Sequence, residues 1–301
     1  MSETGRGPEQ TGALRLTKHH GAGNDFLVLL DADGTGSFSA PQVRVLCDRH
    51  RGVGADGVIR VTRGAGTALV MELRNADGET AEMSGNGIRC AVQAAVDARW
   101  VEPGPVTVDS AAGRRVVEYR SGDRVGLGSA RVDMGQVRLG AEATDRLPAG
   151  LPGLRAAREV DVGNPHLVVL GDAVDDATVR RVGAALERSV PGGTNVEFVW
   201  PGPGDDALTL RVWERGVGET LACGTGACAA VAAAHGWGVV GTTVAVHSPG
   251  GTLEVELRGP LATLSGPTEK VAEVTVASQW LAARATPSDG AAAPEVVTSR
   301  R

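Results

Sequence analysis

The stretch SGNGIRCAVQAAVDA (residues 84–98) returns in similar form as CGTGACAAVAAAHGW (residues 223–237), 139 residues further along the chain. Each copy opens with a Gly-x-Gly turn and continues as an Ala-rich run that is apolar on almost every side. A helix that is apolar all round is expected to be buried. The pattern therefore predicts a buried helix just after each turn, over about residues 88–98 and 227–237.

Other segments repeat in the same order at nearly the same offset. Residues 23–28 match 163–168, and residues 106–110 match 244–248. Collinear matches of this kind indicate an internal duplication. Strands are expected at 26–31, 68–74, 106–109 and 115–119, and again at 167–170, 207–213, 244–247 and 253–257, with polar helices at 40–49 and 175–188. The sequence therefore predicts two similar domains, each with strands wrapped round one buried helix.

The composition is that of a globular protein. Of the 301 residues 42% are hydrophobic, the net charge is −6, and the 43 glycines follow no Gly-X-Y period, which excludes collagen and disfavours disorder. The negative charge disfavours nucleic acid as a partner, and no apolar run is long enough to predict a membrane span. Lys18 and Lys270 are the only lysines. Because a pyridoxal-phosphate enzyme needs a Schiff-base lysine, their scarcity favours chemistry without that cofactor.

The four cysteines are Cys47, Cys90, Cys223 and Cys228, and none forms a CxxC pair. The polar N-terminal residues contain no apolar core of a signal peptide. Together these features predict free thiols in a reducing cytoplasm. The six histidines form no HxH or HxxxH pair, so no metal site is predicted.

The residue before each Gly-x-Gly turn carries a hydroxyl or a thiol, Ser84 in one copy and Cys223 in the other. A helix N-terminus offers unpaired N–H groups and the positive end of the helix dipole, which suit a carboxylate. A cysteine placed there is expected to have a lowered pKa. If the two domains face each other, one acid/base group lies on each side of a bound carbon. That geometry predicts stereoinversion, in which one group removes a proton and the other returns one.

These segments together resemble diaminopimelate epimerase, within the cofactor-independent amino-acid epimerase and racemase superfamily. The resemblance covers about residues 14–281. The segments that carry it are HHGAGNDFLVLLD (19–31), CDRHRGVGADG (47–57), RNADGETAEMSGNGIRC (74–90), VGNPH (162–166), TNVEF (194–198), ERGVGETLACGTGACAA (214–230) and PGGTLEV (249–255).

The resemblance implies an α/β (α+β) fold of two pseudo-symmetric domains, each a curved, largely antiparallel sheet round a central helix. The expected boundaries are 14–130 for the first domain, with about 272–282 returning to it as a last strand, and 131–271 for the second. Residues 1–13 and 283–301 are expected to be disordered tails. The implied reaction interconverts LL- and meso-diaminopimelate for lysine and peptidoglycan synthesis without a cofactor, with a small-molecule amino-acid substrate and possibly a homodimeric enzyme.

The resemblance also assigns roles to individual residues. The reactive α-carbon is expected near Cys223, with Ser84 opposite, and His166 and Glu214 are expected to tune the pKa values of the catalytic thiols. The backbone at Gly85, Asn86, Gly224 and Thr225 is expected to meet the substrate carboxylate and amine. The expected substrate-binding side chains are Asn24, Asn75, Asn164, Asn195, Glu214 and Arg215, of which Asn75, Asn164, Asn195 and Arg215 would hold the distal amino-acid head.

One departure from the family pattern matters for the chemistry. Ser84 stands where the family has its first catalytic cysteine, and Cys90, about one helical turn further on, is not expected to replace it. Three readings stay open. The chain is an epimerase in which Ser84 exchanges the proton more slowly, for diaminopimelate or another amino acid. Alternatively it is a one-base enzyme such as a lyase acting through Cys223, or a non-catalytic ligand-binding homologue.

Overall fold

The computed structural model describes residues 12–81, 83–148 and 153–285. The helices of this part of the chain are α1 (Ala40–Cys47), α2 (Gly85–Asp97), α3 (Asp176–Ser189), α4 (Gly224–Gly236), α5 (Ser278–Ala285) and a short 3-10 helix at Thr144–Arg146. The strands are β1 (Ala13–Gly21), β2 (Asn24–Leu30), β3 (Gly57–Arg63), β4 (Leu69–Asn75), β5 (Thr80–Ala81), β6 (Gly104–Ser110), β7 (Gly113–Ser121), β8 (Leu127–Gln136), β9 (Arg138–Glu142), β10 (Leu154–Asp161), β11 (Pro165–Gly171), β12 (Asn195–Pro201), β13 (Ala207–Glu214), β14 (Gly218–Thr220), β15 (Thr243–Ser248), β16 (Gly251–Arg258) and β17 (Leu261–Ala277).

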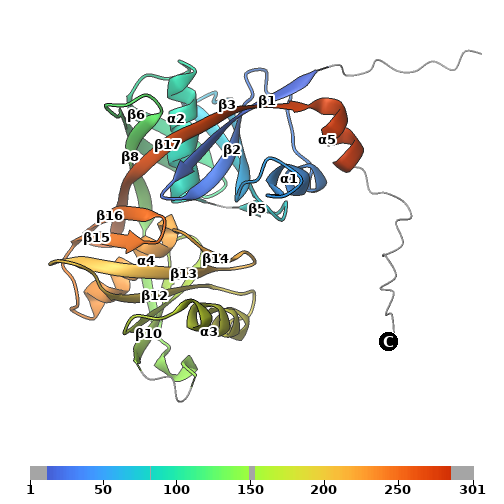
Figure 1. Ribbon diagram of the computed structural model, residues 1–301. Helices are drawn as coiled ribbons and strands as arrows, with labels where there is room; N and C mark the ends of the chain where they lie inside the picture. The colour runs from blue at the N-terminus through green and yellow to red at the C-terminus, as the bar shows by residue number, and fades with distance from the viewer. Residues whose placement is uncertain (1–11, 82, 149–152, 286–301) are drawn as a thin grey trace, which may run out of the picture.

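Two lobes lie one above the other, and each surrounds a central helix (Figure 1). In the upper lobe α2 contacts β1, β2, β7, β8 and β17, and in the lower lobe α4 contacts β10, β11, β12 and β16. The mixed fold with strands wrapped round a central helix, predicted from the sequence, is confirmed.

The two central helices are buried for different reasons. In α4, small apolar residues leave every position from Gly224 to Ala234 buried. In α2, by contrast, Arg89 and Gln93 are also fully buried. The Arg89 guanidinium donates to the carbonyl oxygens of Gly85 and Pro267, so its charge is satisfied inside the lobe.

Strand pairing repeats between the lobes in matching register. Phe26 of β2 lies beside Gly57 of the parallel strand β3, and His166 of β11 lies beside Asn195 of the parallel strand β12. The antiparallel partners β4 and β13 then follow in the same way. This register makes Ile59 of β3 and Glu197 of β12 equivalent positions.

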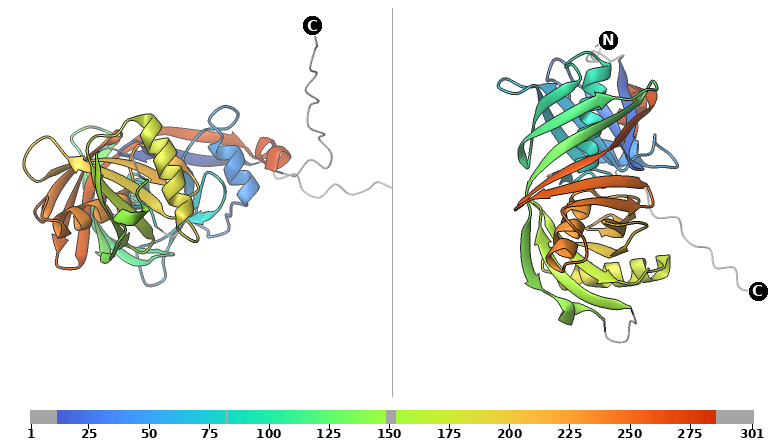
Figure 2. Two further views of the ribbon diagram at one scale, coloured as in Figure 1. Left: turned by 90° about the horizontal axis from the view of Figure 1, so that it is seen from below. Right: turned by 90° about the vertical axis from the view of Figure 1, so that its left-hand side faces the viewer.

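The long strand β17 belongs to both lobes. Its first part pairs with β16 and β8, and its second part pairs with β1 from Ala13 to His20. Figure 1 shows it running from the lower lobe across the upper one to α5, and the left-hand view of Figure 2 shows the strand reaching that helix. The strand ends at Ala277, so the predicted last strand over about residues 272–282 is wrong in its final residues: Ser278–Ala285 forms α5, whose Leu281 packs into the core with Leu46 of α1.

The central helices begin earlier than predicted, at Gly85 and Gly224 rather than after the Gly-x-Gly turns. The cause is helix capping. The Ser84 hydroxyl accepts a hydrogen bond from the Gly87 N–H, and the Cys223 sulfur accepts one from the Gly226 N–H. Each Gly-x-Gly is therefore the first turn of its helix, capped by the residue before it.

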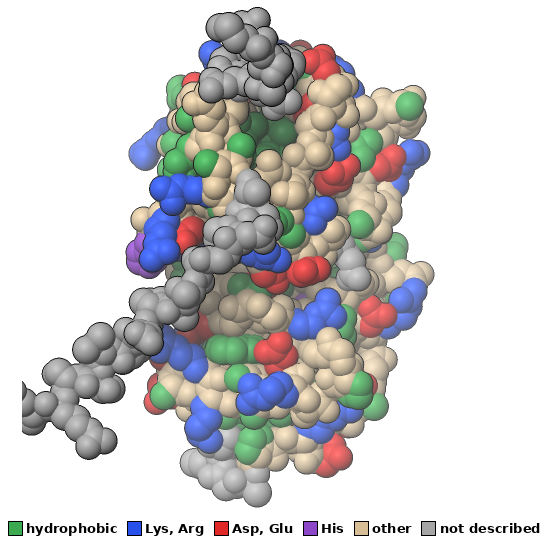
Figure 3. Space-filling model, turned by 90° about the vertical axis from the view of Figure 1, so that its right-hand side faces the viewer, with side chains coloured by type: hydrophobic (Ala, Val, Ile, Leu, Met, Phe, Trp, Pro, Cys, Tyr) green, Lys and Arg blue, Asp and Glu red, His purple; other side chains and the backbone are tan. Residues whose placement is uncertain are grey.

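The predicted tails lie mostly outside the described residues, which begin at Gly12 and end at Ala285. Where they overlap, Ala13 begins β1 and residues 283–285 belong to α5. The boundaries of the two domains stay a prediction. No helix within residues 12–81, 83–148 and 153–285 is long and apolar enough to cross a membrane. Basic and acidic side chains are interspersed over the face drawn in Figure 3.

Candidate active site

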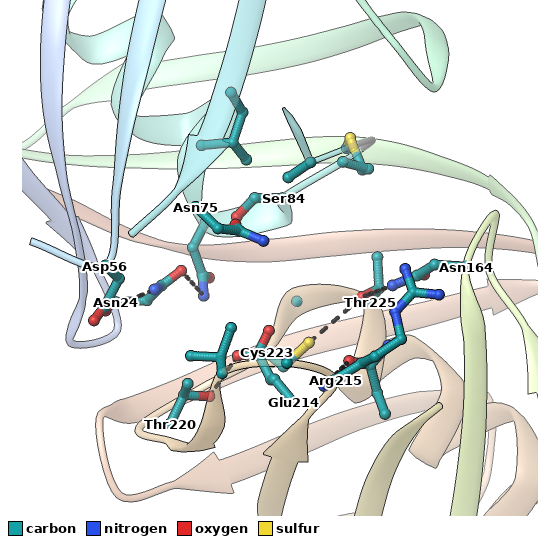
Figure 4. Close-up of a pocket in the computed structure, with 18 of the residues that line it drawn as sticks. Asn24, Asp56, Asn75, Ser84, Asn164, Glu214, Arg215, Thr220, Cys223 and Thr225 are labelled. Carbon is teal, nitrogen blue, oxygen red and sulfur yellow. Dashed lines mark hydrogen bonds between the residues drawn. The ribbon is translucent and has the colours of Figure 1, made fainter. Parts of the chain in front are cut away.

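One cavity of about 310 Å³ is lined by residues from both lobes. It contains nearly all the residues expected at the site. Those that line it are Asn24, Asn75, Ser84, Gly85, Asn86, Asn164, Asn195, Glu214, Arg215, Cys223, Gly224 and Thr225. Figure 4 shows Ser84 and Asn75 on one side of the space and Cys223, Glu214 and Arg215 on the other. His166 is the exception, because it lies behind Asn164 and lines a neighbouring cavity instead.

The two helix N-termini meet at their first glycines. A Cβ on Gly85 would lie 2.7 Å from Leu264 Cδ2 and 3.3 Å from the Gly224 Cα, and a Cβ on Gly224 would lie 3.0 Å from the Gly85 Cα. Real Cβ atoms essentially never approach other atoms to 2.7 Å. Glycine at both positions therefore allows the positive ends of α2 and α4 to converge on one cavity.

Cys223 is almost fully buried and its thiol has few polar partners. The sulfur accepts from the Gly226 N–H at 3.3 Å and contacts the Thr225 hydroxyl at 3.4 Å. Burial, with the nearby charges of Glu214 and Glu197, raises the pKa of Cys223 well above its ordinary value. The expectation of a lowered pKa is wrong for this structure, because desolvation and two carboxylates outweigh the helix terminus. The thiol is protonated near neutral pH, in the form that can donate a proton.

Glu214 lies at the end of β13, in the wall of the cavity. Burial raises the pKa of Glu214 to about 7, against the opposing effect of a hydrogen bond donated by the Thr220 hydroxyl. A carboxyl group with a pKa near 7 can both accept and release a proton at neutral pH. Glu214 is thus suited to take up a proton when the Cys223 thiol loses one and to release it when the thiol is protonated again.

Behind Cys223 lies a histidine paired with a carboxylate. His166 Nδ1 lies 2.7 Å from Glu197 Oε1, and both side chains have no exposed surface. His166 Nε2 lies 2.9 Å from Asn164 Oδ1. Both ring nitrogens of His166 therefore have partners other than the Cys223 thiol.

Among the described residues, Ser84 has no histidine–carboxylate pair behind it. Its hydroxyl has the Gly87 N–H as partner, at 3.0 Å. The positions equivalent to His166 and Glu197 are Phe26 and Ile59. Cys90, which was not expected to replace the missing cysteine, is fully buried in α2, and burial raises its pKa to about 11.

Four of the expected binding asparagines make side-chain hydrogen bonds within the protein: Asn24, Asn164, Asn86 and Asn195. The Asn86 amide donates to Asn24 Oδ1 and to the Ala222 carbonyl, and its oxygen accepts from Arg89. Asn195 accepts from the Arg215 backbone N–H and donates to the Pro165 carbonyl. Their side chains position the wall of the cavity, and Asn195 in particular places Arg215.

Sequence reasoning missed several residues of the site. Asp56 accepts a hydrogen bond of 2.8 Å from the Asn24 amide and is paired with Arg49, and it lines the cavity. Glu197 stands inside the TNVEF segment, where its inward position in β12 was the available signal. Carboxylates outnumber cations around the cavity. The acidic residues that line it are Asp56, Asp77, Glu79 and Glu214, and the basic one is Arg215.

Within the described ranges 12–81, 83–148 and 153–285, no group of three or more His, Cys, Asp or Glu side chains is placed to hold a metal ion. The four cysteines are free thiols. The groups that line the cavity and can exchange a proton include the Cys223 thiol, the Ser84 hydroxyl and the carboxyl groups of Asp56, Asp77, Glu79 and Glu214.

Comparison with known proteins places this geometry in context. A family model described as diaminopimelate epimerase matches residues 16–140 and 159–270. A diaminopimelate epimerase from Synechocystis sp. is 39% identical over 277 residues, covering 86% of this chain and 97% of that protein. One from Desulforudis audaxviator is 41% identical over 280 residues, covering 86% and 97%.

Solved structures resemble the fold at low sequence identity. A probable proline racemase from Agrobacterium radiobacter superposes with a TM-score of 0.68 at 18% identity, covering 88% of this chain and 93% of that one. A hydroxyproline epimerase from Agrobacterium vitis gives 0.66 at 17% identity, covering 90% and 94%. At such identities the likeness concerns the fold alone.

Proposed function

Since the chain belongs to the diaminopimelate epimerase family, we propose that it interconverts LL- and meso-diaminopimelate by two-base proton transfer at the α-carbon. The observation that carries the proposal is the pair of helix N-termini at one cavity, with Cys223 capping α4 and Ser84 capping α2. Two proton-transfer groups from opposite lobes suit inversion of a carbon held between them.

The helix N-termini supply the electrostatic part of the proposed reaction. Backbone N–H groups at Gly85, Asn86, Gly224 and Thr225 bind the α-carboxylate. Loss of the α-proton moves negative charge into that carboxylate, where the positive ends of both helices stabilise it. The carboxylates that line the cavity attract the positively charged ammonium groups of the substrate.

The acid/base roles follow from the surroundings of each group. Cys223 starts as a thiol and donates a proton to one face of the carbon. To act as a base in the reverse direction it loses its proton first, and Glu214, with its pKa raised to about 7, accepts that proton. Ser84 serves the opposite face: after its hydroxyl has released its proton to solvent in the cavity, the oxygen accepts the α-proton when Cys223 donates, and the hydroxyl returns a proton in the reverse direction. The proton transfer at Ser84 limits the rate for two reasons. A hydroxyl is a weaker acid than a thiol, and Phe26 and Ile59 stand in this lobe where the Cys223 lobe has His166 and Glu197.

The distal amino-acid head of the substrate is bound by Arg215, Asn75 and Asn164. Arg215 offers a fork of donors that matches a carboxylate, and Asn195 holds its backbone in place. These residues line the same cavity as Cys223. This arrangement favours a substrate with a second amino-acid end over one with a plain apolar side chain.

We further propose that the protein is a homodimer located in the cytoplasm. Size-exclusion chromatography with light scattering tests whether it is a dimer.

A second candidate function is a one-base reaction through Cys223. One asymmetry of the site favours it: the positions that hold His166 and Glu197 in the Cys223 lobe hold Phe26 and Ile59 in the Ser84 lobe. Such an enzyme would exchange the α-hydrogen of one stereoisomer without inverting it.

The test is incubation of LL- and meso-diaminopimelate separately in D₂O, followed by mass spectrometry and chiral chromatography. Two-base epimerisation predicts that each isomer yields the other with deuterium at the α-carbon. Exchange from one isomer without inversion would establish the one-base alternative. Binding without exchange or turnover would identify a ligand-binding homologue.

A further inference from the structure

A continuous chain of polar contacts leads from a buried carboxylate to the Cys223 sulfur. Glu197 contacts His166, whose Nε2 contacts Asn164 Oδ1 at 2.9 Å. The Asn164 amide nitrogen donates to Thr225 Oγ1 at 3.4 Å, and that hydroxyl lies 3.4 Å from Cys223 Sγ. Figure 4 shows the last contacts, from Asn164 through Thr225 to Cys223.

The direction of these hydrogen bonds follows from donor counting. Because Asn164 Oδ1 is an acceptor, His166 Nε2 must carry a proton. The 2.7 Å contact between His166 Nδ1 and Glu197 needs a second proton between them. Thr225 Oγ1 accepts from Asn164, which leaves its own proton free to point at the Cys223 sulfur. Donors therefore run from the histidine toward the thiol.

Stability does not explain a carboxylate at this position. Glu197 has no exposed surface, and its Oε2 is buried with no hydrogen-bond partner among the described residues. An unsatisfied buried oxygen is destabilising. The equivalent position in the other lobe holds Ile59, which is fully buried without that penalty. The Glu197 carboxylate destabilises the folded protein at a position where the other lobe has an aliphatic residue. This difference indicates that Glu197 has a functional role in the Cys223 lobe.

We propose that Glu197 is a positioning residue that, through His166 and Asn164, aims the Thr225 hydroxyl at the Cys223 sulfur and so stabilises the thiolate. The proposal rests on the proposed acid/base role of Cys223. The thiolate then receives two donors, the Thr225 hydroxyl and the Gly226 N–H. Together these donors make ionisation accessible during turnover.

A direct effect of charge opposes this arrangement. The charged groups near the thiol are Glu214 of β13 and Glu197 of β12, and both raise the pKa of Cys223. His166 of β11 lies between Glu197 and Asn164 in the chain of contacts. The two effects of Glu197 have opposite signs, so a measurement of thiolate reactivity distinguishes them.

The first test compares Thr225→Val with Thr225→Ser in the free enzyme. Both variants are alkylated with iodoacetamide between pH 7 and 10, and labelling of Cys223 is followed by mass spectrometry with Cys223→Ala as the blank. Loss of the hydroxyl in T225V is expected to slow alkylation about tenfold at pH 8, because hydrogen bonds to charged groups are strong. T225S retains the hydroxyl and is expected to stay within about twofold of the wild type. Equal rates in the two variants would overturn the proposal.

The second test compares Glu197→Leu with Glu197→Gln. Glutamine can donate to His166 Nδ1 and keep the proton on Nε2, so E197Q is expected to alkylate within about twofold of the wild type. E197L leaves the histidine without its anchor and is expected to be slower, by about fivefold, but to have no further effect in the T225V background. Faster alkylation in both variants would show that the direct charge of Glu197 dominates and would contradict the proposal.

These measurements need no substrate, so they remain informative if the chain proves not to be an epimerase. If E197L does not fold, E197Q tests the role of Glu197 beside the Thr225 pair, and an E197Q alkylation rate more than about twofold from the wild type would overturn that role. Failure of the proposed function would appear in the D₂O experiment, and failure of this inference in the alkylation rates.

Discussion

The N-termini of α2 and α4 share a backbone but differ in what surrounds them. Both helices start at a glycine, both are capped by the side chain before it, and their first glycines touch. The cap of α4 is a thiol with Glu214 and Glu197 nearby, whereas the cap of α2 is a hydroxyl, and Phe26 and Ile59 occupy the positions equivalent to His166 and Glu197. The duplicated backbone is therefore similar on both sides of the cavity, whereas the buried histidine–carboxylate pair is present on one side and replaced by Phe26 and Ile59 on the other.

The same contrast extends into the helices. Arg89 of α2 donates to Gly85, Asn86 and the β17 backbone at Pro267, which ties this helix to the strand shared by both lobes. Its equivalent in α4 is Cys228, a small buried residue. In the Ser84 lobe the buried Arg89 side chain therefore makes hydrogen bonds to backbone carbonyls at the start of α2 and in β17. In the Cys223 lobe the polar contacts are instead made to the Cys223 sulfur, by the Thr225 hydroxyl and the Gly226 N–H.

The largest effect is expected from Cys223→Ala. Removing the better acid/base group leaves no thiol in the cavity, and the epimerisation rate should fall at least about a thousandfold. The control is Cys228→Ala, on the same helix but outside the cavity, which should retain activity within a few-fold. Chiral chromatography of the product measures both. A Cys223→Ala enzyme with wild-type turnover would remove the thiol from the mechanism.

The next largest effect concerns the contact between the lobes. Gly85→Ala places a methyl group 2.7 Å from Leu264 and 3.3 Å from the Gly224 backbone. The free energy of unfolding should fall by about 1–3 kcal/mol. Gly66→Ala is the control, because nothing lies within 4 Å of its added methyl group. Urea unfolding of the two variants measures the difference, and equal stabilities would show that the helix termini are not tightly packed.

Ser84→Cys restores a thiol to both lobes and so removes the main chemical difference between them. A thiol ionises more readily than a hydroxyl, so the rate should rise about tenfold. Ser84→Ala should lower it. The initial rates of both variants in both directions are compared with the wild type. A slower Ser84→Cys enzyme would mean that Ser84 is not the proton-transfer group of its lobe.

The smallest effect concerns the carboxyl group beside the thiol. Burial raises the pKa of Glu214 from 4.5 to about 7, so its contribution to stability is complete below about pH 4.5 and is lost as the pH rises through 7. Glu214→Gln has no charge to bury and should be more stable than the wild type at pH 8, by about 1–2 kcal/mol, with a smaller difference at pH 5. Urea unfolding at the two pH values tests this sign. A difference that is larger at pH 5 would place the pKa of Glu214 below its ordinary value.

Much of the architecture could be predicted because the two copies of the duplicated segment share local sequence patterns. The apolar runs marked the central helices, and the positions of Ser84 and Cys223 beside glycines marked the helix N-termini. The start of each helix was missed, since capping by a side chain decides whether the glycines lie before the helix or within its first turn. Likewise the first residues of α5 were expected to continue the last strand and its final residues to belong to the tail, and the long-range contact of Leu281 with Leu46 of α1 has no local signal in the sequence.

The protonation of the site was harder to predict than the identity of the residues that line it. Sequence motifs placed Cys223 at a helix N-terminus, which alone favours the thiolate. They did not reveal that the sulfur is buried beside Glu214 and Glu197, and these long-range neighbours reverse the direction of the pKa shift. The roles of Asp56 and Glu197 also depend on contacts between strands far apart in sequence.

The measurement that tests the central claim most directly is exchange of the α-hydrogen from each stereoisomer by Ser84→Ala and Cys223→Ala in D₂O. If Cys223 and Ser84 serve opposite faces, Ser84→Ala will exchange the α-hydrogen of one isomer only, and residual exchange in Cys223→Ala will be confined to the other. Exchange of both isomers by Ser84→Ala would contradict the assignment of one proton-transfer group to each lobe.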